Sequence, residues 1–254
     1  MRLKTIHIYD RTLPQPNYPI LPGAQCSWYS LNEEPILNKD EAKNIVLVKE
    51  NCHSADFLRY FLKFANPQKR FITHVFLMEH KEEPRKSFFL TDATLNIDPT
   101  LYQRAKSVEL ILEFIKKYPN LCKNHSNWVN FLTHSGDFDL RNKVSCDARL
   151  LCDYFNNIPV YSENQFTHYQ YDSCFYPESR EAKGIKEGAL DNHLVPTILS
   201  VPNIDTGNAI YKALFPFYNG CGYLLGGDVI GILNSRSCLD LNRESMLKLI
   251  REVD

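Results

Sequence analysis

Short apolar runs alternate along the chain with longer amphipathic segments, a pattern that predicts β-strands and α-helices in turn. We expect strands at 45–48, 71–78, 88–90, 128–132, 197–201, 223–225 and 229–233. We expect helices at 54–64, 99–119, 145–155, 206–215 and 243–253. This alternation favours an α/β protein built around a sheet.

The longest expected helix begins at Pro99, because proline is tolerated in a first turn, and Pro119 ends it. Apolar side chains at helical spacing predict its core-facing stripe: Leu101, Ala105, Val108, Leu112 and Ile115. Residues 1–37 show no such periodicity, and prolines recur through them. We therefore expect no regular element in that part of the chain.

Composition narrows the class of protein. The 254 residues are 44% hydrophobic and 23% charged, which is ordinary for a globular protein. A net charge of -1 gives no basic excess for wrapping a nucleic acid, so we exclude that class of partner. No apolar run reaches the roughly 18 residues of a membrane span, and the N-terminus has no signal-like apolar core. We expect a cytoplasmic protein with no membrane partner.

Metal and disulfide chemistry find little support in the sequence. The eight cysteines form no Cys-x-x-Cys pair, and a chain of this length without a secretory signal usually keeps its thiols reduced. None of the eight histidines pair at the i, i+4 spacing of a helix-borne metal site. We expect no metal site.

The segment 202–208 is the first candidate for ligand binding. It joins an expected strand to an expected helix, and the free N–H groups of such a helix start point toward the edge of the sheet where α/β proteins bind anions. Gly207, followed by Asn208, lets a ligand or a second backbone come close. The alternative is an ordinary helix start with Asp205 as its N-cap.

Ser235 and Arg236 follow an apolar, glycine-containing run and form the second candidate. The planar guanidinium matches phosphate oxygens, and the hydroxyl can donate to an oxyanion. Asp240, four residues on, could take the proton of a thiol. The alternative is a surface salt bridge or a helix cap.

Two further loops carry candidate groups. Lys49 to Ser54 joins a strand to a helix, which is a common place for phosphate binding, or else an ordinary polar connection. Thr91 and Asp92 end a strand, where the carboxylate could bind a ligand hydroxyl or simply cap a turn.

These segments, in this order, resemble the motifs of the phosphate acetyl/butyryltransferase family. The segments that carry the resemblance are 49–58, 73–78, 90–99, 145–148, 183–185, 202–212 and 235–236. The Leu90-Thr91-Asp92-Ala93-Thr94-Leu95-Asn96-Ile97-Asp98-Pro99 stretch is similar to the family's Thr-Asp-Ala-Ala-x-Asn-x-x-Pro. Ser145 falls where the family has a hydroxyl residue at a helix start.

The resemblance implies a two-domain α/β fold of the isocitrate/isopropylmalate dehydrogenase type, with a cleft between the domains. It implies a first domain of residues 1–92 with 231–254, a second of 93–230, and a homodimer. The implied reaction is acyl-CoA plus phosphate giving acyl phosphate plus CoA, with a short-chain acyl group and no metal or prosthetic group.

The resemblance also implies roles for the candidate residues. Arg236 would hold the phosphate and the developing charge, Ser235 would support it, and Asp240 would be the acid or base at the sulfur. The implied substrate-binding residues are Lys49, Ser54, Thr91, Asp92, Ser145, Gly207 and Asn208.

Departures from the family pattern define an alternative. Glu50 stands where the family has glycine, and the segment around Asp172 is altered. A relative that has lost catalysis and kept a binding or scaffold role is therefore a second hypothesis. A decarboxylating dehydrogenase of similar fold would need converging carboxylates for a divalent metal, and the sequence offers none.

Overall fold

The computed structural model describes residues 4–9, 25–32, 45–65, 71–91, 95–158, 168–182, 195–234, 244–245, 247–249 and 251–252. The chain folds into two compact units. Unit 1 comprises Met1–Thr73, Phe114–Leu121 and Gly220–Asp254, and unit 2 comprises His74–Glu113 and Cys122–Asn219. The domains expected at 1–92 with 231–254 and at 93–230 stay a prediction.

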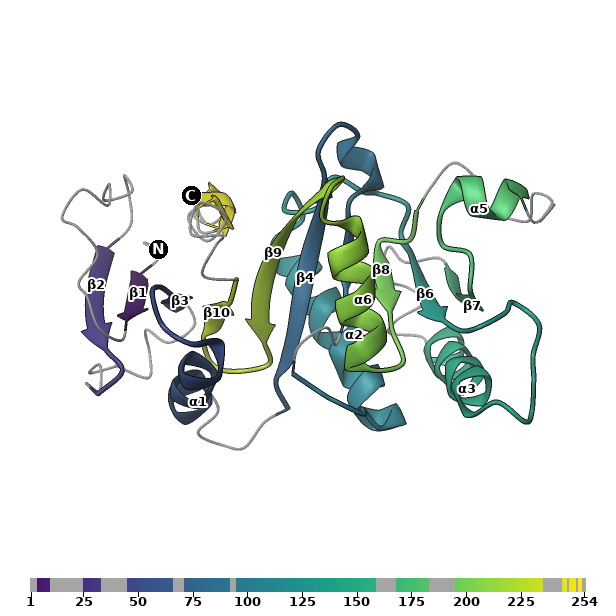
Figure 1. Ribbon diagram of the computed structural model, residues 1–254, viewed down its shortest axis with the longest axis horizontal. Helices are drawn as coiled ribbons and strands as arrows, with labels where there is room; N and C mark the ends of the chain where they lie inside the picture. The colour runs from purple at the N-terminus through teal and green to yellow at the C-terminus, as the bar shows by residue number, and fades with distance from the viewer. Residues whose placement is uncertain are drawn as a thin grey trace. The chain divides into compact units, whose positions relative to one another are not determined.

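Unit 1 is built on a mostly parallel sheet (Figure 1). Its strands are β2 (Gln25–Ser30), β1 (Lys4–Tyr9), β3 (Ile45–Lys49), β10 (Ile230–Ile232) and β9 (Tyr218–Leu225), in that spatial order. All pair in parallel except β9, which is antiparallel to β10. Helix α1 (Ser54–Ala65) follows β3 and packs its Phe61 against Gly231 of β10.

The expectation that residues 1–37 hold no regular element was wrong. Strands β1 and β2 occupy two proline-free stretches on either side of the proline-rich segment. Thr5 and Ile6 of β1 are buried, and β1 pairs with β3 along five residues. Strand β1 is fixed by pairing with β3, some forty residues further on in the sequence, and β2 by pairing with β1, so a local pattern could not reveal them.

The strands of unit 2 run in mixed directions, with helices on their faces. The strands, in spatial order, are β4 (Thr73–His80), β5 (Phe88–Leu90), β8 (Ile198–Ser200), β6 (Trp128–Leu132) and β7 (His168–Asp172). Strands β5, β8, β6 and β7 are parallel, and β4 is antiparallel to β5. The other elements are η2 (Pro84–Lys86), α2 (Leu101–Lys117), α3 (Lys143–Asn157), α5 (Pro177–Ala182) and α6 (Ile204–Leu214).

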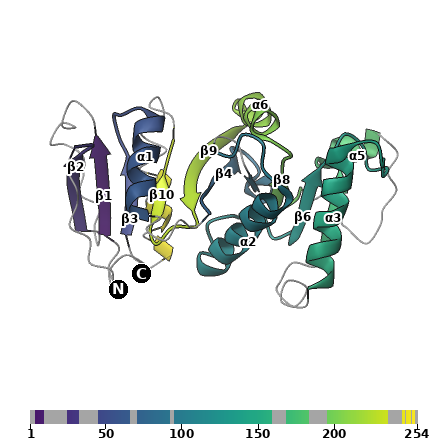
Figure 2. The same cartoon turned by 90° about the horizontal axis from the view of Figure 1, so that it is seen from below.

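Helix α6 covers one face of the unit 2 sheet, and α2 lies on the other (Figure 2). Under α6, Phe76, Leu199 and Val201 form a core with Tyr218, and the Tyr211 ring stacks on Phe76 with centroids 4.1 Å apart. This core holds the strand that leads into α6, and so it fixes where that helix begins.

The predicted alternation of strands and helices is confirmed, and so is the α/β class. The expected strand at 128–132 matches β6, while β7 and the short α5 were not predicted. In the segment at the C-terminus expected to be helical, the described residues are helical. Among the described residues, no helix is both long and apolar enough to span a bilayer.

The buried stripe of α2 differs from the predicted one. Its buried residues are Arg104, Ser107, Val108, Glu109, Ile111 and Phe114, and of the predicted stripe Val108 alone is fully buried. The apolar spacing selected Leu101 and Ile115, which are only half-buried, because the face of the helix that is buried includes a guanidinium, a hydroxyl and a carboxylate. Polar residues on a buried helix face cannot be recognised from hydrophobic periodicity.

Candidate active site at the carboxyl ends of the strands

The candidate residues that the structure describes lie where strands end or in the first turns of helices. Four of them, Ser235, Arg236, Asp240 and Asp92, lie outside the described residues. The others can be placed, each within its own unit.

In unit 1, Lys49 and Asn234 meet where β3 and β10 end. The two strands pair in parallel with Val48 opposite Ile232, so the residues that follow are neighbours. The Lys49 ammonium is fully buried and its Nζ donates to the main-chain oxygen of Asn234 at 2.9 Å. Ser235 and Arg236 come directly after this contact in the sequence.

The carboxamide of Asn234 ties β10 to β9. Its Oδ1 accepts a hydrogen bond from the main-chain N–H of Gly222, and Leu233 N donates to the oxygen of the same glycine at 2.9 Å. Asn234 is 3% exposed. Asn234 was not predicted to have a role. The available signal was a polar residue that ends an apolar strand just before Ser235 and Arg236.

The connection from β3 to α1 turns sharply. Glu50 is buried, and its main-chain oxygen accepts from Cys52 N at 2.8 Å. Ser54 is the first residue of α1 and is exposed to solvent. Asp56, in the first turn of α1, complements the positive end of the helix dipole.

In unit 2, the carboxyl ends of β5 and β8 are joined through Thr91. Its N–H donates to the oxygen of Leu199 at 3.1 Å, and its Oγ1 accepts from Val201 N at 3.2 Å. The hydroxyl is fully buried in this contact. Thr91 therefore fixes the turn that leads from β8 toward α6.

Helix α6 begins with a satisfied cap. Asn203 is the N-cap, and its Oδ1 accepts from Thr206 N at 2.9 Å and from the Thr206 hydroxyl at 2.8 Å. The alternative prediction of Asp205 as cap was off by two residues. Gly207 is buried and Asn208 half-buried in the first turns of the helix.

Ser145 lies in the first turn of α3 and is fully buried. Its N–H donates to Oδ1 of the N-cap Asn142, and its Oγ accepts from Asp139 N, both at 3.1 Å. These contacts hold the loop before the helix.

The end of β7 carries a buried carboxylate. Asp172 Oδ1 accepts from Cys174 N at 3.0 Å, and the Asp172 main-chain oxygen accepts from Asn130 Nδ2 at 3.2 Å. The sequence pointed to Asp172 only within a segment that departs from the family pattern, and to Asn130 not at all.

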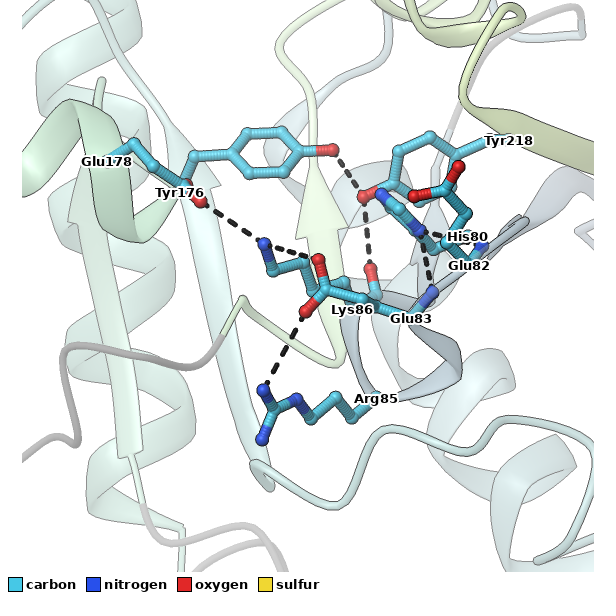
Figure 3. A network of polar contacts seen from close by, with 8 residues as sticks. All are labelled: His80, Glu82, Glu83, Arg85, Lys86, Tyr176, Glu178 and Tyr218. Carbon is cyan, nitrogen blue, oxygen red and sulfur yellow. Dashed lines mark hydrogen bonds and ion pairs between the residues drawn. The ribbon is translucent and has the colours of Figure 1, made fainter.

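The described part of unit 2 also has a polar network that the sequence did not reveal (Figure 3). Tyr176 donates its hydroxyl proton to Tyr218, whose own hydroxyl donates to the Lys86 oxygen at 3.2 Å. Burial is the main cause that raises the pKa of Tyr218, to about 12, and it also raises the pKa of Tyr176. His80 Nδ1 accepts from the N–H groups of Glu82 and Glu83, which orders the turn before η2.

This network lies at the amino end of β5. Phe88 is the first residue of that strand and pairs with Met78 of β4, and Lys86 comes two residues before it. A hydrogen bond with Glu83 is the main cause that raises the pKa of Lys86, and the same bond lowers the pKa of Glu83. The network is thus separated along β5 from Thr91, and we regard it as structural.

Among the described residues, no group of three or more His, Cys, Asp or Glu side chains is placed to hold a metal ion. The expectation that the reaction needs no metal or prosthetic group stays a prediction.

No model of a known protein family matches the chain, and no curated protein matches it. Solved structures do. The fold is similar to a branched-chain phosphotransacylase from Enterococcus faecalis V583, with a TM-score of 0.72, 22% identity and 99% of each chain covered.

It is also similar to a phosphotransacetylase from Streptococcus pyogenes and to the EutD phosphotransacetylase from Staphylococcus aureus, with TM-scores of 0.59 and 0.56 at 18% identity. In both cases the match includes 82% of this chain and 63% of the other protein's chain. At these identities the likeness establishes the fold, and it confirms the fold that the motif resemblance implied: the chain has the fold of phosphotransacylases.

Proposed function

We propose that the protein is a phosphate acyltransferase that converts a short-chain acyl-CoA and phosphate into acyl phosphate and CoA. The observation that carries this proposal is the match along 99% of both chains to a branched-chain phosphotransacylase. The ordered motifs around Lys49, Thr91, Gly207 and Arg236 support it independently, because they were recognised in the sequence alone.

The proposed chemistry is an acyl transfer without cofactor. A phosphate oxygen attacks the thioester carbonyl carbon, a C–O bond forms, and negative charge grows on the carbonyl oxygen. The C–S bond then breaks and CoA leaves as thiolate, and Asp240 takes the proton of the attacking hydrogen phosphate and passes it to the sulfur. Arg236 neutralises the phosphate and Ser235 donates to the developing charge, which is where donors lower the barrier most.

The test is thiol release from acetyl-, propionyl- and butyryl-CoA, with and without phosphate. We expect phosphate-dependent release, and Arg236→Ala should lower kcat/KM by about 10³-fold, in the range seen when a charge-stabilising donor is removed. Arg59→Ala is the matched control, since it removes an exposed guanidinium paired with Asp56 on α1 of the same unit. A folded protein that releases no CoA from any of these substrates contradicts the proposal.

A second candidate is a relative that binds these ligands without turning them over. Glu50 favours this candidate, because it stands where the family has glycine. Glu50 is buried, and it directly follows Lys49 in the sequence. Saturable turnover that Arg236→Ala abolishes would exclude this candidate.

We further propose a homodimer, located in the cytoplasm where acyl-CoA and phosphate are available. Among the described residues, all the large apolar side chains that are exposed belong to unit 2, and Leu140 and Leu150 are 79% and 55% exposed. Light scattering after gel filtration should give twice the chain mass, and Leu150→Asp should shift it toward the monomer. A monomeric wild type contradicts the proposal.

A further inference from the structure

Asn234 has one polar atom that nothing in the described structure satisfies. Its main-chain oxygen accepts from Lys49, and its Oδ1 accepts from Gly222 N. Its Nδ2, which carries two N–H donors, is buried and has no hydrogen-bond partner among the described residues. Because a main-chain N–H must meet an oxygen, the Gly222 contact also fixes which end of the carboxamide is the donor.

The two contacts that hold Asn234 come from the strands on either side of β10. Lys49 extends from the end of β3, and Gly222 belongs to β9, which is antiparallel to β10. A side chain held in this way loses little further freedom when it binds a ligand, and rigid supporting contacts are the usual property of a preorganised donor.

A second buried asparagine shows what a purely structural role looks like in this chain. Asn124 is 3% exposed, the same fraction as Asn234. Its Nδ2 donates to the oxygens of Val195 and Pro196 at 3.1 and 3.2 Å, and its Oδ1 accepts from Ser126 N at 2.8 Å. Buried carboxamides are normally satisfied at both ends in this way. Asn130 Oδ1 and Gln170 Nε2 in unit 2 also lack a partner among the described residues. What distinguishes Asn234 is that its spare donor belongs to the residue directly before Ser235 and Arg236.

We propose that Asn234 is a ligand-binding residue whose Nδ2 donates a hydrogen bond to an anionic oxygen of the substrate, and that Lys49 is the residue that positions it. This inference rests on the proposed function for the identity of the ligand, which is phosphate or the acyl oxygen that becomes charged in the reaction. Location supports it: Asn234 ends β10 at the carboxyl edge and immediately precedes Ser235 and Arg236.

The decisive variant is Asn234→Asp, which keeps an oxygen for Gly222 N and replaces the donor by an acceptor. We expect kcat/KM for phosphate to fall about 100-fold, as for the removal of one donor to a developing oxyanion. Asn234→Ala removes donor and acceptor without adding charge, and it should give a similar loss in kcat/KM. It replaces the aspartate variant as the test if that variant does not fold.

The matched control is Asn124→Asp, which removes two donated hydrogen bonds outside the candidate site. It should lower the melting temperature and leave the KM for phosphate of the folded enzyme within about twofold, because it changes stability alone. A merely structural Asn234 would behave in the same way.

Kinetics and phosphate binding, followed by calorimetric titration, separate this inference from the proposed function. If wild type turns over and Asn234→Asp keeps its kcat/KM within threefold, the inference is overturned and the function stands. If wild type binds phosphate without turnover and Asn234→Asp binds it tenfold more weakly, the function fails and the binding role stands. If wild type neither turns over nor binds phosphate, both fail.

Discussion

The carboxyl ends of the strands in the two units are built from similar residues and differ in which polar groups they leave without a partner. In unit 2, Thr91 Oγ1 accepts from Val201 N, and Asn203 caps α6 through Oδ1. In unit 1, the buried asparagine at the end of β10 keeps a donor without a partner among the described residues. Ser200 Oγ, at the end of β8 in unit 2, is also buried without a partner among the described residues. The difference lies in the group left over, which is a freely rotating hydroxyl in unit 2 and the carboxamide of a residue held by two contacts in unit 1. We infer that the unit 1 edge is the one prepared to meet a ligand.

The largest loss of stability should come from adding a side chain at Gly231, on the strand that carries Asn234 in unit 1. A Cβ added at Gly231 would lie 2.7 Å from Phe61 Cε2 and 2.9 Å from Leu224 Cβ. Gly231→Ala should therefore displace β10 and cost about 2 kcal/mol of unfolding free energy, as other overpacked cores do. Urea unfolding measures the loss, and the KM for phosphate should rise because Asn234 is carried on the same strand.

The matched control for that variant is Gly136→Ala in unit 2. There the new Cβ would meet Asp172 Oδ1 at 3.3 Å on an exposed loop, so a smaller loss is expected. If the two variants lose equal amounts of unfolding free energy, the crowding at Gly231 costs no more than the looser contact at Gly136, and the prediction is wrong.

Alkaline pH should weaken unit 2. Burial raises the pKa of the Cys122 and Cys152 thiols to about 12 and that of the Tyr169 phenol to about 12. Above pH 9 these thiols ionise in the unfolded chain and stay protonated in the folded one, so the unfolded state releases protons and stability falls as pH rises. At pH 10 the loss relative to neutral pH is about 1.5 kcal/mol for each thiol.

The measurement is the urea midpoint between pH 8 and pH 10.5. Cys122→Ala should flatten the slope, because it removes one of the groups that titrate. An unchanged slope in that variant would contradict the assignment of the effect to the buried thiol.

The smallest effect belongs to the cap of α6. Asn203→Ala should cost about 1 kcal/mol, and Asn203→Asp should keep most of the stability, since a carboxylate caps equally well. Thermal unfolding measures both. A loss of activity larger than the loss of folded protein would contradict a structural role for the unit 2 edge.

The sequence predicted the elements whose signal is local. The strands β3, β5 and β6 lie in short apolar runs that are buried from both sides, and such runs are visible without any partner. Strands β1 and β2 were missed because β1 pairs with β3, far along the chain, and β2 in turn pairs with β1. The face of α2 was misplaced because Arg104, Ser107 and Glu109 are buried on it.

The candidate site was predictable in part, for the same reason. Lys49 and Thr91 could be proposed because each follows a recognisable strand within a motif. Asn234 could not, since its importance lies in contacts with Lys49 and Gly222, one from each neighbouring strand. Which of the buried asparagines keeps a spare donor is a property of the fold.

The order of the strands has a consequence for synthesis of the chain. Unit 2 is nearly continuous, from His74 to Asn219, while the unit 1 sheet needs both β3 and β10, which the whole of unit 2 separates in the sequence. Since domains fold as their residues leave the ribosome, we expect unit 2 to form first. During that interval β3 has β1 beside it and no β10, so the edge that carries Asn234 is the last part of the protein to be assembled.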